Sequence, residues 1–487
     1  MDKNLTSLKP ASVWKHFAEI AAIPRPSHSE EKIRRYLVAF AESRGLEHTV
    51  DEAGNVYMRK GATAGMENRK GIVMQAHVDM VPQKNNDKVF DFENDPIEAC
   101  IDGGWVTANG TTLGADNGIG VAAILAVLED DTIEHGPIEA LFTATEETGM
   151  DGAFGLKGGL LKGEILLNLD SETEGELYVG CAGGTDANVT LRYEAEAVPA
   201  EGYEPLRLAV KGCKGGHSGI QIICQRANAN RLLFRLVRML GHVTDLKLCW
   251  VDGGGLRNAI PREAEAVVMV GAADVQAVKQ TVEAFGKTVA AEFAGIEDSI
   301  SITAEAAERP ARMIPDAVAD KLAAAMVACP DGVVRMSTAM EGLVQTSNNL
   351  ARVVSDGSTV KVQTLMRSSV RSEKEALADA ISAVFELAGA EVELTGSYDG
   401  WNPDMNSPIL KAMLASYEAL YGVRPSVTAI HAGLECGIIG SKYEGLDMIS
   451  FGPTICYPHS PDEKVEIASV AKFYDFLLHT LKNAPAK

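Results

Sequence analysis

Three short apolar segments of the sequence end in acidic residues or histidine, and this pattern restricts the fold more than any other feature. The segments are "GIVMQAH", "IEALFTATEE" and "EILLNLD", which end at His77, at Glu146 and Glu147, and at Asp170. Near-continuous apolar runs of this length without helical periodicity predict strands that are covered on both faces. In an α/β sheet the carboxyl ends of such strands form one edge, where ligands bind. We therefore expect these polar side chains to gather at that edge.

The first of these segments continues with a second polar residue, because Asp79 follows His77 after one spacer. Side chains two residues apart on a strand point to the same face, so these two would stand side by side at the strand's exit. One interpretation is a hydrogen-bonded polar pair at the edge of a sheet. The other is part of a functional site.

The segments around these strands predict helices. One helix is expected over residues 11–22, and a second follows "PRPSHSEEKIRRYLVAFAESRGL", where Ser27 and Glu30 fit a capping box and Gly45 supplies the stop. In "TTLGADNGIGVAAILAVLED", Asp116 directly precedes a helix of small and apolar residues. The alternation of strands and helices predicts an α/β fold.

The character of the sequence changes after about residue 187. Alternating strands such as "EAEAVVMVGAA" are interspersed with amphipathic helices such as "ANANRLLFRLVRML", and the α/β character resumes from about residue 399. The order of helices and strands between these points suggests two similar halves. We expect an α/β domain with a mixed, mainly parallel sheet over residues 1–186 and 399–487, interrupted by an inserted α+β domain over residues 187–398.

Composition excludes several classes of partner and site. The 487 residues carry a formal net charge of −22, which argues against binding to nucleic acid or to an anionic membrane. The amino-terminal sequence lacks a basic segment followed by an apolar core, and we expect a cytoplasmic protein. The eight cysteines include no C-x-x-C pair, which argues against a thiolate zinc site; Cys436 and Cys456 are expected to be buried thiols.

A metal site explains the polar residues at the ends of apolar segments more simply than separate structural roles do. The candidates are His77, Asp116, Glu146, Glu147, Asp170 and His459. Two neighbouring cations need three or four protein ligands each, and one carboxylate can bridge them. Imidazole and carboxylate ligands suit zinc, and also manganese or cobalt. Such a site would leave one further acid free for proton transfer.

Six motifs together resemble the metallopeptidase family of dinuclear aminoacylases, glutamate carboxypeptidases and carnosinase-like dipeptidases. They are "HVDMVP", "LGADNGIG", "TATEETGMDGA", "LNLDSE", "GGHSG" and "YPHSPDE", and the resemblance covers essentially the whole chain. It implies that Asp116 bridges two divalent metal ions, that His77 and Asp170 complete one site, and that Glu147 and His459 complete the other. Zinc is the expected metal, with cobalt or manganese as alternatives.

The resemblance also implies roles for two acids that are not ligands. Asp79 would orient His77 and raise its basicity. Glu146 would be the general base, beside the ligand Glu147 but directed to the attacking water. At Asp116-Asn117 the resemblance implies an unusual backbone with a cis peptide bond.

The inserted domain would act as a lid that contributes substrate contacts. The resemblance implies that His217 in "GGHSG" stabilises the developing oxyanion and that Asn258 and Arg367 hold the substrate carboxylate. Taken alone, a histidine in a glycine-rich loop is more often a turn residue. Gly433 in "HAGLECG" would bring backbone close to the substrate, and Glu435 would either receive a free amino group or serve as a structural partner.

The expected activity is therefore metal-dependent hydrolysis of unblocked dipeptides, including Xaa-His and β-alanyl-histidine. "IPRPSHSEEKI", "HAGLECG" and "PHSPDE" together resemble the branch of the family that has this activity, and "HAGLECG" departs from the loop common in aminoacylases. An aminoacylase or a tripeptidase is the alternative on the same site, and a non-catalytic metal-binding protein is the alternative from another class. A homodimer is compatible with the family. Because the insert is long enough for two lid-sized units, we expect His217 to act within its own chain.

Overall fold

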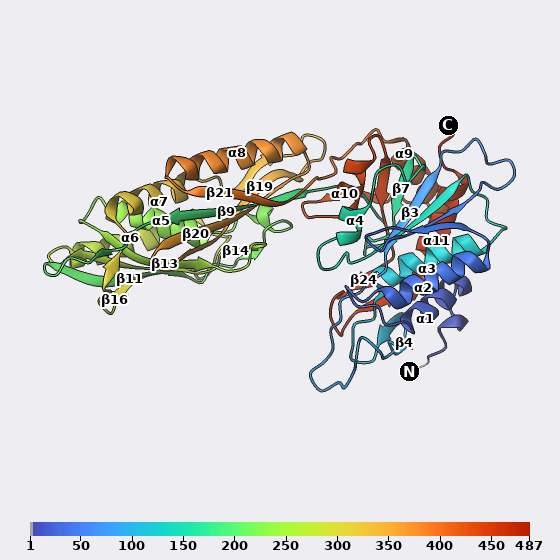
Figure 1. Cartoon of the computed structure of the whole chain (residues 1–487), viewed down its shortest axis with the longest axis horizontal. Helices are drawn as coiled ribbons and strands as arrows, with labels where there is room; N and C mark the ends of the chain where they lie inside the picture. Colours follow the sequence, from blue (N-terminus) through green and yellow to red (C-terminus); the bar gives the residue numbers. More distant parts are fainter. Residues whose placement is uncertain (1–2) are drawn as a thin grey trace. The chain divides into compact units, whose positions relative to one another are not determined.

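The computed structural model describes residues 3–487, and these divide into two compact units (Figure 1). The first unit contains the described residues up to Cys181 together with Trp401–Ala429 and Leu434–Lys487. The second contains Ala182–Gly400 and the short return Ile430–Gly433. The chain therefore enters the second unit twice, whereas the sequence pattern indicated a single insertion.

The first unit is built on a mixed sheet whose four central strands are parallel. The pairs β6–β3, β3–β7 and β7–β23 are parallel, and β2 and β8 flank them in antiparallel orientation. This confirms the expected α/β sheet. In spatial order the strands are β1 (Glu47–Val50), β2 (Val56–Lys60), β6 (Ile138–Thr143), β3 (Ile72–His77), β7 (Ile165–Asn168), β23 (Asp447–Ser450), β8 (Glu176–Cys181) and β22 (Ser426–Ile430).

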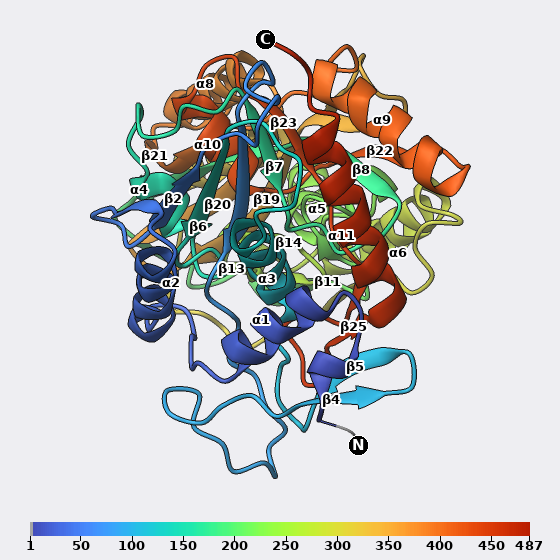
Figure 2. The ribbon, with the colours of Figure 1, turned by 90° about the vertical axis from the view of Figure 1, so that its right-hand side faces the viewer.

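Helices pack around this sheet, and α3 is the most deeply enclosed of them (Figure 2). Every residue of α3 from Ala115 to Leu128 is buried, because the helix contacts β3 on one side and helices α1 and α11 on others. Its many small side chains permit this close packing. The helices of the unit are α1 (Ala11–Ala21), α2 (Glu31–Ser43), α3 (Ala115–Glu129), α4 (Asp151–Gly155), α9 (Pro408–Tyr421), α10 (Glu435–Lys442) and α11 (Ile467–Lys482), with a 3-10 turn at η1 (Leu5–Ser7).

The capping box predicted for α2 is wrong. The helix begins at Glu31, and no side chain caps its first turn. Ser27 instead donates a hydrogen bond to Asp79 at 2.8 Å, and Glu30 accepts one from Thr145 at 2.7 Å. Both residues therefore serve the loops at the carboxyl edge of the sheet and not the helix.

A small antiparallel sheet completes the first unit and carries the segment that follows His459. Its strands are β24 (Ile455–Cys456), β25 (Lys464–Glu466), β5 (Trp105–Ala108) and β4 (Ala99–Asp102). The loop that contains His459 joins β24 to β25. These two strands pair with each other, and β25 also pairs with β5, so both ends of the loop are held.

The second unit is an antiparallel sheet with helices on one face, in agreement with the expected α+β composition (Figure 1). The path of the sheet is β16 (Ser301–Ala306), β11 (Tyr203–Lys211), β15 (Ala264–Gly271), β13 (Lys247–Gly254), β19 (Val344–Ser355), β20 (Thr359–Ser368), β9 (Gly183–Arg192) and β21 (Glu391–Tyr398), and β18 (Gly332–Met336) also pairs with β19. Its helices are α5 (Ala229–Leu240), α6 (Val275–Glu292), α7 (Asp316–Ala328) and α8 (Arg371–Leu387). They bury one continuous apolar core against the strands.

His217, the histidine predicted to contact substrate, lies in a short strand pair near the end of β13. Strand β12 (Gly216–His217) pairs with β14 (Ala259–Ile260), and the 3-10 turn η2 (Ile222–Cys224) follows. A further two-stranded pair joins β10 (Glu196–Ala197) and β17 (Arg312–Met313). Among residues 3–487, no helix combines the length and apolarity needed to span a bilayer.

Candidate metal centre

The parallel strands bring the predicted polar residues to one edge of the first unit's sheet. Strand β3 ends at His77, β6 is followed by Glu146 and Glu147, and β7 is followed by Asp170. Since the three strands are adjacent and parallel, their carboxyl ends lie together. Asp116 reaches the same edge from the start of α3, where its backbone has non-helical angles (φ −79°, ψ 110°).

Asp116 lies between two groups of possible ligands. Its Oδ1 is 3.0 Å from His77 Nε2, and its Oδ2 is 3.1 Å from His459 Nε2. Asp170 Oδ1 is 3.3 Å from the same His77 nitrogen, and Glu147 Oε2 is 3.0 Å from His459 Nε2. The side chains thus form two triads that share Asp116, and the ligand atoms of each triad lie within 4.8 Å of one another.

The donor set fits a pair of divalent cations. Each triad offers one imidazole nitrogen and two carboxylates, and the shared carboxylate presents one oxygen to each side. Glu147 Oε1 is buried without a hydrogen-bond partner among the described residues. A carboxylate oxygen left in this way is costly unless a cation binds it. A third combination, His77 with Glu146 and Glu147, is also close enough to hold an ion.

Asp79 connects the ends of two strands below this cluster. Its carboxylate accepts the backbone N–H groups of Glu146 at 3.0 Å and of Glu147 at 3.2 Å, and its backbone oxygen lies 3.2 Å from His77 Nδ1. The nearer carboxylate oxygen is 3.4 Å from the same nitrogen. Against the effect of burial, hydrogen bonding to His77 and to the Glu146 amide lowers the pKa of Asp79 to about 2. A permanently ionised Asp79 can hold His77 and the two glutamates in register.

Thr145 has an unusual backbone conformation immediately before the two glutamates. Its φ of 55° lies in the left-handed region, which a β-branched residue rarely adopts. The hydrogen bond from its hydroxyl to the buried carboxylate of Glu30 holds it there. Because of this turn, Glu146 and Glu147 do not continue the alternating side-chain directions of β6. The bond between Asp116 and Asn117 is cis, as the resemblance implied.

The pKa shifts in the cluster reflect crowded negative charge. Burial raises the pKa of Glu146 well above its usual value and raises the pKa of Asp170 to about 6. Hydrogen bonds to Asp116 and Glu147 raise the pKa of His459 to about 11. Carboxylates and imidazoles bind a divalent cation only without their protons. A cation that binds to this cluster would therefore displace the protons that these groups retain.

Glu435 lies in the first unit, beneath this cluster, and is almost completely buried. Its Oε2 accepts hydrogen bonds from Gln75 at 2.6 Å and from Thr143 at 2.8 Å. Burial raises the pKa of Glu435 to about 8. Of the two roles that the sequence left open, these contacts favour the structural one.

In the second unit, three polar residues lie around Gly219. Two of them, His217 and Arg367, were predicted from the sequence, and His431 was not. A β-carbon on Gly219 would lie 2.3 Å from the backbone oxygen of His431, 3.0 Å from His217 Cε1 and 3.3 Å from Arg367 Nε. Arg367 Nε is buried without a partner among the described residues. Asn258 is exposed, and its backbone oxygen accepts the N–H of Ser218 at 2.8 Å. The motif glycine therefore permits His217 and Arg367 to approach each other.

The hydrogen bonds of His217 define its tautomer. Its Nδ1 accepts the backbone N–H groups of Gly219 at 3.2 Å and Ile220 at 3.1 Å. Burial and the charge of Arg367 lower the pKa of His217, so the imidazole is neutral. The proton is consequently on Nε2, which can donate to a carbonyl oxygen. Gly433 lies at the end of the short return segment, close to the Tyr398 ring.

Several residues that support the cluster were not singled out from the sequence. Arg25, Gln75 and Glu463 are buried polar residues, and two of them interact mainly with backbone groups of the loops that carry the possible ligands. The available signal was a charged residue inside a motif, at Arg25 in "IPRPSHS" and at Glu463 in "PHSPDE". Sequence alone does not show that such a residue binds main-chain atoms.

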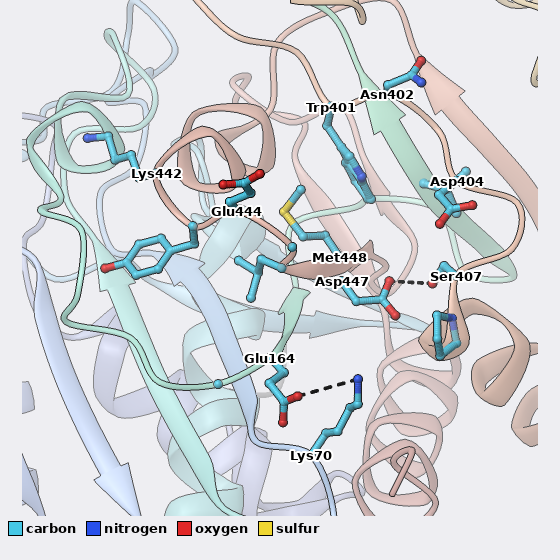
Figure 3. A pocket seen from close by; sticks show the side chains of 16 residues that line it. Lys70, Glu164, Trp401, Asn402, Asp404, Ser407, Lys442, Glu444, Asp447 and Met448 are labelled. Atoms are coloured by element: carbon cyan, nitrogen blue, oxygen red, sulfur yellow. Dashed lines mark hydrogen bonds and ion pairs between the residues drawn. The ribbon is translucent and has the colours of Figure 1, made fainter. Parts of the chain in front are cut away.

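A separate cavity of about 790 Å³ lies at the opposite edge of the sheet (Figure 3). It is lined by residues at the amino ends of β7 and β23, including Glu164 and Asp447. Glu164 pairs with Lys70 at 3.7 Å, and Asp447 accepts a hydrogen bond from Ser407 at 2.6 Å at the start of α9. Both carboxylates thus have partners within the protein, and the cavity lies at the end of the strands away from the cluster.

Two carboxylate and imidazole triads that share Asp116 thus form a candidate site for two metal ions at the carboxyl edge of an α/β sheet. Residues 73–483 match the model of Peptidase family M20/M25/M40, and the chain belongs to this family. It is 46% identical over 483 residues to the cytosol non-specific dipeptidase of Escherichia coli K12, with 99% of each chain covered.

Solved structures agree with this assignment. The crystal structure of aminoacylhistidine dipeptidase from Vibrio alginolyticus matches with a TM-score of 0.96 and 46% identity, covering 99% of each chain. That of aminopeptidase PepT from Bacillus cereus matches with a TM-score of 0.59 and 16% identity, covering 98% of this chain and 99% of that one, and shows a shared fold.

Proposed function

We propose that this chain is a metal-dependent dipeptidase that hydrolyses unblocked dipeptides, including Xaa-His and β-alanyl-histidine. The observation that carries the proposal is the pair of triads that share Asp116, next to Glu146, which belongs to neither of those two triads. The names of the Escherichia coli and Vibrio relatives, each 46% identical over nearly the whole chain, support the substrate class.

In this proposal His77, Asp116 and Asp170 would hold one cation, and Asp116, Glu147 and His459 would hold the other. When bound, the two cations supply Lewis acidity that acidifies water and polarises the scissile carbonyl. Zinc suits the ligands, and cobalt and manganese are the alternatives to test.

Proton transfer belongs to Glu146. Glu146 is half-buried, burial raises its pKa well above the usual value, and its backbone is fixed by the hydrogen bond to Asp79. A carboxylate with a raised pKa accepts a proton from the attacking water and then delivers it to the leaving amine. Asp79 supports the reaction by fixing His77 and the Glu146 backbone.

The second unit would supply the substrate contacts. His217 is a neutral imidazole with its proton on Nε2, which suits donation to the developing oxyanion. Arg367 has a buried Nε without a partner among the described residues and can grip the terminal carboxylate. Asn258 would be a second group that holds this carboxylate. Gly433 would leave room for the substrate backbone. In this scheme the first unit is the catalytic domain and the second is a lid.

A substrate panel tests the activity. Purified protein loaded with zinc, cobalt or manganese is assayed on free dipeptides, on the same dipeptides with an acetylated amino terminus, and on tripeptides. We expect cleavage of free dipeptides, with those ending in histidine among the substrates. Preference for the acetylated compounds would indicate an aminoacylase, preference for tripeptides a tripeptidase, and no hydrolysis with two ions bound a non-catalytic metal-binding protein.

We further propose that the protein is cytoplasmic, because its Escherichia coli relative is named a cytosol dipeptidase, and that any homodimer leaves each active site within one chain. Mixing His217→Ala subunits with Glu146→Ala subunits tests the second point. An own-chain site regains no activity in the mixture, whereas a site shared between subunits regains part of it.

A further inference from the structure

Glu463 is a buried carboxylate that the mechanism above does not use. It is 2% exposed and accepts the backbone N–H groups of four consecutive residues. Its Oε2 binds the amides of Leu113 at 2.8 Å and Gly114 at 3.0 Å, and its Oε1 binds those of Ala115 at 2.7 Å and Asp116 at 3.3 Å. One side chain thus satisfies the whole backbone segment that leads into the shared carboxylate.

This segment needs such a partner because it lies at the start of α3. The first amides of a helix have no carbonyl partner within the helix. Asp116 itself departs from helical angles, and therefore this turn relies on groups from elsewhere in the chain. Hydrogen bonds from neutral amides to a carboxylate are stronger than those between neutral groups.

Arg25 holds the other side of the same segment. Its Nη2 donates to the backbone oxygen of Gly114 at 2.5 Å, and its Nη1 donates to the backbone oxygens of Val78 at 2.9 Å and Asp79 at 3.0 Å. Burial lowers the pKa of Arg25, and the negative charge of Glu463 opposes this effect. Arg25 therefore ties the loop after His77 to the segment before Asp116, and Glu463 ties the same segment to the loop after His459.

We propose that Glu463 is a positioning residue for the metal centre, which sets the orientation of the Asp116 carboxylate between the two cations. It lies four residues after His459, so the same side chain fixes the spacing between the shared ligand and a ligand of the second ion. The inference depends on the proposed dinuclear site and adds a residue that acts on it through the backbone. Partners behind the direct ligands typically change metal affinity by about 10- to 100-fold when they are lost.

The first unit offers a matched control in Glu139. This carboxylate is 4% exposed and accepts the backbone amides of Lys162 at 2.9 Å and Gly163 at 3.1 Å as well as the Tyr57 hydroxyl at 2.8 Å. It thus resembles Glu463 in burial and in binding backbone amides, although it also pairs with Arg59 at 3.2 Å. None of its partners is a candidate metal ligand. Substituting it measures the effect of losing a buried, amide-binding carboxylate from the same unit.

The experiment measures zinc affinity by chelator competition, metal content per chain and thermal unfolding for the wild type, Glu463→Gln, Glu463→Asp and Glu139→Gln. We expect Glu463→Gln to bind zinc about 10- to 100-fold more weakly, and added zinc to restore its metal content. Glu463→Asp keeps the charge but is too short to reach all four amides, so its affinity should fall between those of the wild type and Glu463→Gln. Glu139→Gln should lower the melting temperature and leave zinc affinity unchanged.

Two results would overturn the inference. One is zinc affinity in Glu463→Gln within twofold of the wild type, and the other is an equal loss of affinity in Glu139→Gln. If Glu463→Gln does not fold, Glu463→Asp gives the same comparison. A wild type that binds no pair of ions overturns the dinuclear site together with this inference, whereas wild-type binding with unaltered affinity in the variants overturns this inference alone.

Discussion

Replacing Glu146 by glutamine is expected to remove turnover while leaving both metal ions bound. The backbone N–H of Glu146, which Asp79 accepts at 3.0 Å, is unaffected by the change, so the turn should persist. Neither triad that shares Asp116 loses a member. Loss of a general base lowers rate by about 10²- to 10⁴-fold, which corresponds to about 3 to 5 kcal/mol of transition-state stabilisation.

Hydrolysis of a free dipeptide at saturating substrate gives the change in kcat, and elemental analysis gives the ions per chain. Glu147→Gln serves as the matched variant, because it alters the neighbouring carboxylate and should release one ion. The reasoning about Glu146 fails if its variant loses an ion, since His77, Glu146 and Glu147 are also close enough to form a binding group. It fails equally if kcat falls by less than about tenfold, which is below the range for a general base.

Three further predictions concern the shared ligand, the lid and pH. Asp116→Ala should release both ions and His459→Ala one, and two ions retained in Asp116→Ala would contradict a bridging role. Arg367→Ala should raise KM for dipeptides by about 10- to 100-fold, because a charged hydrogen bond contributes about 1.5 to 3 kcal/mol; an unchanged KM would exclude it from carboxylate binding. Burial lowers the pKa of His431 to about 3, so the folded state binds fewer protons than the unfolded state and stability is lost as pH falls below about 6.5. Between pH 7 and pH 5 this loss should be about 2 kcal/mol by chemical denaturation, and His431→Gln should lack that part of the slope.

The strands that carry the candidate ligands were predictable because their apolar runs stop at charged residues. A buried strand tolerates few polar side chains, and therefore His77 and Asp170 marked the strand ends in the sequence as clearly as they do in the fold. The resemblance added the pairing of ligands into two groups. The structure brings those groups together, and their role in metal binding stays a proposal.

The supporting contacts were not predictable, for two physical reasons. Ser27 and Glu30 match the local spacing of a capping box, but tertiary partners compete for their side chains and win. Glu463 binds main-chain amides about 350 residues away, and a backbone amide carries no residue-specific signal. The return of Ile430–Gly433 to the second unit was equally hidden, because four residues are too few to alter a local pattern.

The order of strands in the first unit has a consequence for synthesis of the chain. β23 lies between β7 and β8 in the sheet, yet the ribosome makes it only after the residues of the second unit. Until Asp447–Ser450 emerges, β7 and β8 lack their shared neighbour, and unpaired edges of this kind favour association with other chains. His459 and Glu463 arrive later still. A nascent chain can therefore assemble its second unit early, but it cannot complete its sheet or its candidate metal centre until almost all of its sequence has been translated.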